Sequence, residues 1–211
     1  VCRLAVAGRV TADAGYGGDG RFDGGAATHL VGREVAGKTI GIGGMGRIGT
    51  AVARRALGFG MEVIYRNRTR ANPTVERQVS ARHVGLGELL TTSDVVSLHC
   101  PHNDESHHLL DAAAFAKMKA SALLVNTARG PVVDEAALVD ALKSGEIAGA
   151  GLDVFEDEPE VHPGLMEQDR VVLAPHLGSA TTDTRMRMAQ MCVASITALL
   201  DGAESVPHRL V

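Results

Sequence analysis

The chain has 211 residues, 45% of them hydrophobic, and a formal net charge of −4. These values are ordinary for a folded globular protein, and they argue against a disordered chain or a nucleic-acid-binding surface. No apolar run approaches the roughly 18 residues of a membrane span. Three cysteines far apart in the sequence favour reduced thiols over a disulfide framework. We therefore expect a cytoplasmic protein with no nucleic-acid or membrane partner.

The first 31 residues do not read as the start of a domain. A short helical pattern over 1–10 is followed by a glycine-dense stretch, which is typical of a loop. The sequence opens on Val1 instead of Met, so we expect further chain upstream. We interpret 1–31 as a linker helix and a glycine-rich loop.

From residue 38 onward, short apolar strands alternate with helices. Strands are predicted over 38–42, 62–65, 94–99, 122–126, 149–154 and 171–174. Helices are predicted over 47–57, 86–92, 112–118, 134–143 and 181–200. Parallel neighbours need a crossover, and continuously apolar strands need cover on both faces. The pattern therefore predicts an α/β fold with a doubly wound parallel sheet, in which ligands bind beyond the carboxyl ends of the strands.

Two of these helices carry apolar residues at helical spacing. On the helix 47–57, one side carries Ile48, Val52 and Leu57. On the helix 181–200, one side carries Met188, Cys192, Ile196 and Leu199. We interpret the stripe on the last helix as core packing.

A GMGRIG hexapeptide begins at Gly44, directly after a strand and at the start of a helix. Gly44 allows a tight turn, Gly46 leaves room for a pyrophosphate, and Gly49 lets helix and strand pack closely. Arg47 and Ile48 start the helix, whose N-terminus attracts phosphates. A glycine-rich turn without a ligand is the alternative. The strand–turn–helix context favours a Rossmann-like dinucleotide-binding domain.

The segment after the second strand decides between the two nicotinamide cofactors. An NAD enzyme usually has an acidic residue there for the ribose 2′-hydroxyl. This chain instead has Asn67, Arg68 and Thr69 within an RNRTR run, with three arginines and no acid. Arg68 and its neighbours can pair with a 2′-phosphate. We predict NADP as the cofactor, with NAD possible. The alternative is that the three arginines are solvated on a loop and bind no phosphate.

Polar residues follow three later strands. Arg129 lies in an NTARG motif, Glu158 in LDVFEDEP and His176 in PHLGSA. With the GMGRIG turn, these motifs make the chain resemble the D-isomer-specific 2-hydroxyacid dehydrogenases, from about Gly32 to the C-terminus. Within that family it looks most like the glyoxylate/hydroxypyruvate reductase branch, which often uses NADPH. The resemblance implies a small 2-keto or 2-hydroxy acid as substrate.

The resemblance also implies a role for each polar residue. Arg129 would hold the neighbouring carboxylate and carbonyl of the acid with paired hydrogen bonds. His176 would exchange a proton with the carbonyl oxygen, and Glu158 would orient the imidazole and favour its charged form. The cofactor cleft would be lined by Cys100, Pro101, Thr127, Ala128, Asp153, His176 and Gly178, with Asp153 at the nicotinamide end.

The resemblance further implies a domain organisation. We assign 32–180 to the dinucleotide-binding domain and 181–211 to a helix and tail that return to an N-terminal substrate domain. That substrate domain is expected to be missing here, which would leave part of the apolar face of the helix 181–200 bare. We then expect cofactor binding to survive, whereas catalysis by this chain alone is doubtful. Cofactor domains of the family form dimers, so we expect a homodimer with a contact through 1–31.

Other interpretations stay open at this point. The His-rich segment 99–108 contains metal-ligating residue types, but it lacks the paired spacing of a structural zinc site, and we interpret it as a solvent-facing loop near the cofactor. Arg129 could form a surface salt bridge, Glu158 could be a loop carboxylate, and His176 could cap the last helix. The rival function is a non-catalytic dinucleotide sensor. A methyltransferase would not need the Arg, Glu and His set.

Overall fold

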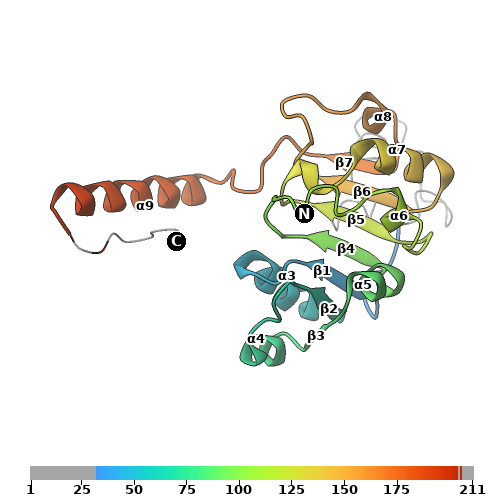
Figure 1. Cartoon of the computed structure of the whole chain (residues 1–211), viewed down its shortest axis with the longest axis horizontal. Coiled ribbons are helices and arrows are strands. Elements are labelled where there is room, and N and C mark those ends of the chain that lie inside the picture. The colour runs from blue at the N-terminus through green and yellow to red at the C-terminus, as the bar shows by residue number, and fades with distance from the viewer. Residues whose placement is uncertain (1–31, 204, 206–211) are drawn as a thin grey trace, which may run out of the picture. The chain divides into compact units, whose positions relative to one another are not determined.

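A computed structural model describes residues 32–203 and 205, and these residues form a seven-stranded sheet in the order β3-β2-β1-β4-β5-β6-β7 (Figure 1). All neighbouring strands in this sheet are parallel. The strands are β1 (Thr39–Gly43), β2 (Glu62–Arg66), β3 (Ala81–His83), β4 (Val95–Leu98), β5 (Leu123–Asn126), β6 (Gly149–Leu152) and β7 (Val171–Leu173). The predicted doubly wound sheet is confirmed, and its strand order reverses between β1 and β4.

Helices connect the strands. They are α3 (Arg47–Gly58), α4 (Pro73–Gln78), α5 (Leu86–Thr92), α6 (Ala112–Phe115), the 3-10 turn η1 (Gly130–Val132), α7 (Glu135–Ser144), α8 (Pro163–Met166) and α9 (Thr182–Leu200). Side chains cap several N-termini: Asp111 accepts from Ala114 N–H, and Asp134 accepts from Ala137 N–H. The elements α4, β3, η1 and α8 were not predicted from the sequence, and the helix predicted over 112–118 ends three residues earlier, at Phe115.

Hydrophobic clusters lie on both faces of the sheet. Leu124 belongs to one cluster and its neighbour Val125 to the other, because side chains alternate along a strand. The first cluster includes side chains of α5, α6 and α7, and the second includes side chains of α3. Both faces are therefore covered, as the continuously apolar strands predicted.

The buried side of α3 differs from the apolar side suggested by the sequence. Its buried residues are Gly49, Ala53 and Ala56, whereas Ile48 is 65% exposed. Small side chains let the helix backbone approach the sheet closely, so the face with the smallest residues is the one that packs inward. Ile48 is left at the surface, beside the turn that opens the helix.

The chain divides into two units, one ending at Pro175 and the other beginning at His176. Within the second unit, α9 buries none of its residues, and Met188, Ile196 and Leu199 are 46%, 58% and 66% exposed. The prediction that this stripe packs in a core is wrong for the described residues, because none of the residues of α9 is buried. None of the described helices combines the length and the apolar character needed to cross a membrane.

Candidate active site

The carboxyl ends of six neighbouring strands lie in one row. The pairing register aligns the last residues of these strands, which are Arg66, Gly43, Leu98, Asn126, Leu152 and Leu173. The loops that follow therefore leave the sheet at a single edge. Adjacent strands are about 4.8 Å apart, so the loops after β1 and β5 start roughly 10 Å from each other. Most of the predicted site residues lie in these loops.

The turn after β1 needs glycine at two positions for steric reasons. Gly44 has a φ of +106°, and a Cβ there would lie 2.6 Å from the backbone nitrogen of Cys100. A Cβ at Gly49 would lie 2.0 Å from the carbonyl oxygen of Gly44. At Gly46, by contrast, no atom of the described residues comes within 4 Å of the Cβ position. Two of the glycines permit close backbone packing, and the middle one faces open space.

The N-terminus of α3 lies at this open space. Gly46 is its N-cap residue and has no side chain to accept a hydrogen bond, and the first turn has no acidic residue. The first N–H groups of a helix have no partner within the helix itself, and they carry a partial positive charge. An anionic group at Gly46 would therefore meet several backbone donors.

A cavity of about 250 Å³ adjoins the glycine turn. It is lined by the predicted residues Gly44, Gly46, Asn67, Arg68, Cys100 and Pro101, and also by Gly43, Arg66, His99, Asn103, Glu105, Ser106 and Leu109. The lining comes from the ends of β1, β2 and β4 and the loops after them. The other cofactor-binding residues predicted in the first unit are not among the lining residues: Arg47, Ile48, Gly49, Thr69, Thr127, Ala128 and Asp153. The cavity lies at the carboxyl ends of β1 and β4, where the strand order reverses. Open α/β sheets bind their ligands at this point.

Asn67 ties the end of β2 to the glycine turn. Its Oδ1 accepts a hydrogen bond of 2.6 Å from the backbone N–H of Met45. The residue at the position of the expected acid is therefore a neutral side chain that braces the turn. This arrangement places no carboxylate from the loop after β2 in the cavity.

The structure separates the three arginines of the RNRTR run. Arg66 and Arg68 line the cavity, whereas Arg70 makes paired hydrogen bonds of 2.9 Å to both carboxylate oxygens of Glu76. The hydroxyl of buried Tyr65 also donates to Glu76, at 2.5 Å. These hydrogen bonds, first from Arg70 and then from Tyr65, lower the pKa of Glu76 to about 2. Arg70 therefore stabilises the loop and, unlike Arg66 and Arg68, does not line the cavity.

The loop after β4 forms the opposite wall of the cavity. It folds through Ser106, whose hydroxyl donates to the carbonyl of Pro101 at 2.7 Å and accepts from Asn103 N–H at 2.8 Å. Burial raises the pKa of the Cys100 thiol, which keeps it in the less reactive protonated form at neutral pH. No group of three potential metal ligands comes together among the residues that the structure describes.

Arg129 lies in the loop after β5, which is stabilised by a buried amide side chain. The Asn126 side chain is 1% exposed, donates to the carbonyl of Arg129 at 2.9 Å and accepts from Ala128 N–H at 3.0 Å. Arg129 is exposed, and Thr127 beside it is half-buried. A Cβ at Gly130 would lie 1.7 Å from the carbonyl oxygen of Phe155, so this loop packs tightly on the one after β6. The sequence reading overlooked Asn126, although a polar residue that ends a buried strand was a usable signal.

The loop after β6 brings Asp153 beside the Arg129 loop. Asp153 is 4% exposed, and its N–H donates to the carbonyl of Asn126 at 3.0 Å. Glu158 is exposed, and its Oε1 accepts from Phe155 N–H at 3.0 Å. These residues share the edge with the glycine turn, as the sequence predicted from their places after successive strands.

A second acid of the same loop has a structural role. Oε1 of Glu156 lies 2.5 Å from Nε2 of His108. The backbone N–H of Glu156 donates to Oε1 of buried Glu135 at 2.8 Å. Burial raises the pKa of Glu135. This network joins the loops after β4 and β6 to the start of α7.

His176 and Gly178 belong to the second unit. The N–H of Ala174 donates to the carbonyl of Leu152 at 2.8 Å, which continues the pairing of β7 with β6 up to the end of the first unit. His176 is the first residue beyond that end, and its φ of +53° lies in the left-handed region. Its predicted contact with Glu158 stays a prediction.

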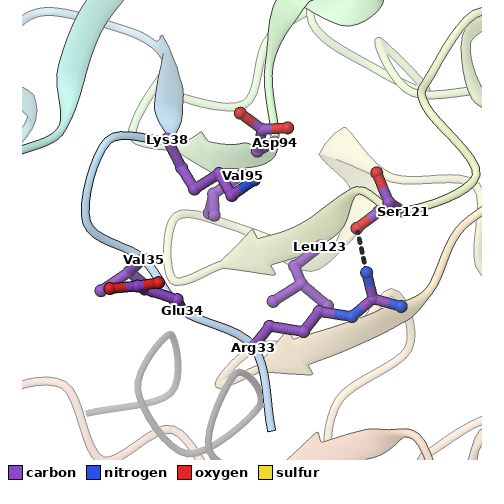
Figure 2. A pocket seen from close by; sticks show the side chains of 8 residues that line it. All are labelled: Arg33, Glu34, Val35, Lys38, Asp94, Val95, Ser121 and Leu123. Atoms are coloured by element: carbon purple, nitrogen blue, oxygen red, sulfur yellow. Dashed lines mark hydrogen bonds between the residues drawn. The ribbon is translucent and has the colours of Figure 1, made fainter.

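Another cavity, of about 290 Å³, lies at the opposite, amino-terminal edge of the sheet (Figure 2). It is lined by Arg33, Glu34, Val35, Lys38, Asp94, Val95, Ser121 and Leu123. Arg33 points across it and donates to the carbonyl of Ser121 at 3.4 Å. None of the predicted site residues lies here, and this edge is not the one at which α/β sheets bind ligands.

Residues 9–178 match the sequence profile described as D-isomer specific 2-hydroxyacid dehydrogenase, NAD binding domain. The chain belongs to this family. The glyoxylate reductase of Thermococcus onnurineus (strain NA1) is 50% identical over 182 residues, which are 86% of this chain and 54% of that protein. The chain thus spans about half the length of this relative.

Solved structures agree with this assignment. The TT0316 protein from Thermus thermophilus is 44% identical with a TM-score of 0.91, and the match covers 99% of this chain and 65% of that one. A glyoxylate reductase from Paecilomyes thermophila is 38% identical with a TM-score of 0.90, over 98% of this chain and 62% of that one. A D-lactate dehydrogenase with NAD+ from Lactobacillus jensenii is 28% identical with a TM-score of 0.84, over 100% of this chain and 66% of that one. The family resemblance inferred from the motifs is confirmed.

Proposed function

We propose that this chain is the cofactor-binding part of a reductase that uses NADP(H) to reduce a small 2-keto acid such as glyoxylate or hydroxypyruvate. One observation carries the proposal: the glycine turn, the Arg129 loop and Asp153 all follow strands whose ends are aligned in one row. The glyoxylate reductases among the relatives support the substrate class.

The residues present fit a dinucleotide. The open space at Gly46 and the N-terminus of α3 suit a pyrophosphate, and Arg68 in the cavity suits a 2′-phosphate. From the loop after β2 to the loop after β6 there are four strand spacings, or roughly 19 Å, along which an extended dinucleotide can lie. Asp153 would then meet its nicotinamide end.

The chemistry proposed at the other end uses three side chains. When bound, the reduced nicotinamide supplies a hydride to the keto carbon. Arg129 holds the acid through its carboxylate and carbonyl oxygens, and Asn126 fixes the loop that presents it. His176 donates a proton to the carbonyl oxygen, and Glu158 favours the charged imidazole. The left-handed backbone of His176 supports a functional role, since such conformations at non-glycine residues are concentrated at functional sites.

Two measurements test the proposal. Titration of the 211-residue chain with NADPH and NADH, followed by nucleotide fluorescence, should give tighter binding of NADPH. In a protein that joins this chain to a substrate domain, glyoxylate-dependent oxidation of NADPH should be lost in His176→Ala while the Kd for NADPH stays within about twofold, because the imidazole acts on the substrate. Equal affinity for both nucleotides would refute the NADP assignment, and His176→Ala with wild-type turnover would refute the catalytic assignment.

The same assays address the rival function. A non-catalytic dinucleotide sensor would bind NADPH and show no turnover with any small 2-keto acid. The predicted dimer contact over 1–31 lies outside the described residues. The homodimer and the cytoplasmic location therefore stay predictions from the sequence.

A further inference from the structure

Arg68 and Glu105 face each other at the cavity beside the glycine turn. Both residues line that cavity, and they come from different loops, Arg68 from the one after β2 and Glu105 from the one after β4. Nη1 of Arg68 lies 3.1 Å from Oε2 of Glu105. One of the two arginines that line this cavity is therefore already paired with an anion of the protein.

This ion pair can open readily. The two side chains are 73% and 67% exposed, so water and salt weaken their attraction. The pairing of Arg70 differs, because its partner Glu76 is buried and binds it through two hydrogen bonds. Arg68 can change partners, whereas Arg70 is held in place.

The backbone that carries Glu105 is fixed. Its N–H donates to the Asn103 side chain at 3.1 Å, and Ser106 beside it bonds to the carbonyl of Pro101 at 2.7 Å. These bonds hold the loop against the cavity. The backbone of Glu105 therefore stays beside the cavity, within reach of Arg68. When its carboxylate faces a phosphate bound to Arg68, two like charges would lie close together.

We propose that Glu105 is a specificity-determining residue. Its carboxylate holds Arg68 in place when no 2′-phosphate is present, and it competes with the phosphate for the guanidinium. This inference rests on the proposed NADP(H) site. It adds that Glu105, on the opposite wall of the cavity, weakens the preference for NADP(H) over NAD(H). Removing the charge of Glu105 should strengthen binding of the 2′-phosphate selectively.

The test compares two small probes that differ only in the 2′-phosphate. Adenosine 2′,5′-bisphosphate and adenosine 5′-monophosphate are titrated into the 211-residue chain by calorimetry. In Glu105→Gln, the Kd of the bisphosphate should fall about three- to tenfold, the range expected for an exposed ion pair together with the lost repulsion. The Kd of the monophosphate should stay within about twofold.

Glu88→Gln is the matched control. Glu88 forms an exposed ion pair with Arg82, and neither residue lines the cavity. This variant should leave both Kd values unchanged. In an Arg68→Gln background, Glu105→Gln should give a smaller gain, because only the repulsion between the carboxylate and the phosphate is then removed. The gain in the wild-type background should shrink as salt is raised.

The outcomes separate the two proposals. If the wild type prefers the bisphosphate and Glu105→Gln behaves like the wild type, the role of Glu105 is refuted and the NADP assignment stands. If the wild type binds both probes equally but Glu105→Gln prefers the bisphosphate, the role of Glu105 stands and the NADP assignment falls. Equal strengthening of both probes also refutes the role of Glu105, and no binding of either probe overturns both.

Discussion

Gly49→Ala should destabilise the fold even though it places a better helix former in α3. The new methyl group would lie 2.0 Å from the carbonyl oxygen of Gly44 and 3.2 Å from Cγ2 of Ile42. The Gly44 backbone cannot retreat easily, because it packs against the backbone at Cys100. Overpacking of this kind costs about 1–3 kcal/mol after repacking. Contact with a backbone atom at 2.0 Å places the cost at the upper end of this range. The gain in helix propensity offsets at most about 1 kcal/mol, which leaves a net cost of about 2 kcal/mol.

Gly46→Ala is the matched comparison in the same turn. Apart from Gly46 and its two chain neighbours, no described residue has an atom within 4 Å of this Cβ position, and the φ of −83° suits any residue. We expect a change in stability below about 1 kcal/mol, as for other substitutions at an N-cap. The methyl group would occupy the space proposed for the pyrophosphate, so the Kd for NADPH should rise about tenfold or more, equivalent to roughly 1.4 kcal/mol.

Thermal denaturation and NADPH titration of both variants test this reasoning. For a chain of this size, a net cost of about 2 kcal/mol in Gly49→Ala should lower the melting temperature by roughly 4–8 °C. Gly46→Ala should melt like the wild type and bind cofactor poorly. The reasoning is refuted if Gly49→Ala is as stable as the wild type. It is also refuted if Gly46→Ala binds NADPH with wild-type affinity.

Two further substitutions probe the loops around the site. Glu76→Gln should destabilise the chain at neutral pH, because Arg70 loses its charged partner. The pKa of Glu76 is lowered from 4.5 to about 2, so the difference in urea midpoint between variant and wild type should be full above about pH 4.5 and shrink as the pH falls toward about 2. A difference in urea midpoint that is unchanged at pH 2 would contradict this assignment. Asn126→Ala should cost about 1–3 kcal/mol, because it leaves buried backbone groups of the Arg129 loop without partners, and unfolding curves that match the wild type would show that the amide does not brace this loop.

The architecture could be predicted because its signals are local. Apolar strands and amphipathic helices repeat along the chain, and parallel pairing follows from their alternation. The missed elements lack those signals. The strand β3 has three residues and no apolar run, and the helix α4 buries a charged residue, Glu76, instead of an aliphatic one. Its burial depends on Arg70 and Tyr65, which no hydrophobic pattern reveals.

The sequence alone determined which residue types follow each strand and that three glycines open α3. Only the tertiary structure decided which of these side chains act together. Arg68 and Arg70 are chemically alike and two residues apart, but one pairs with an exposed acid 37 positions away at a cavity and the other with a buried acid six positions away. A side chain's partner depends on which loops the sheet register brings to the same edge, and that register is a property of the whole fold.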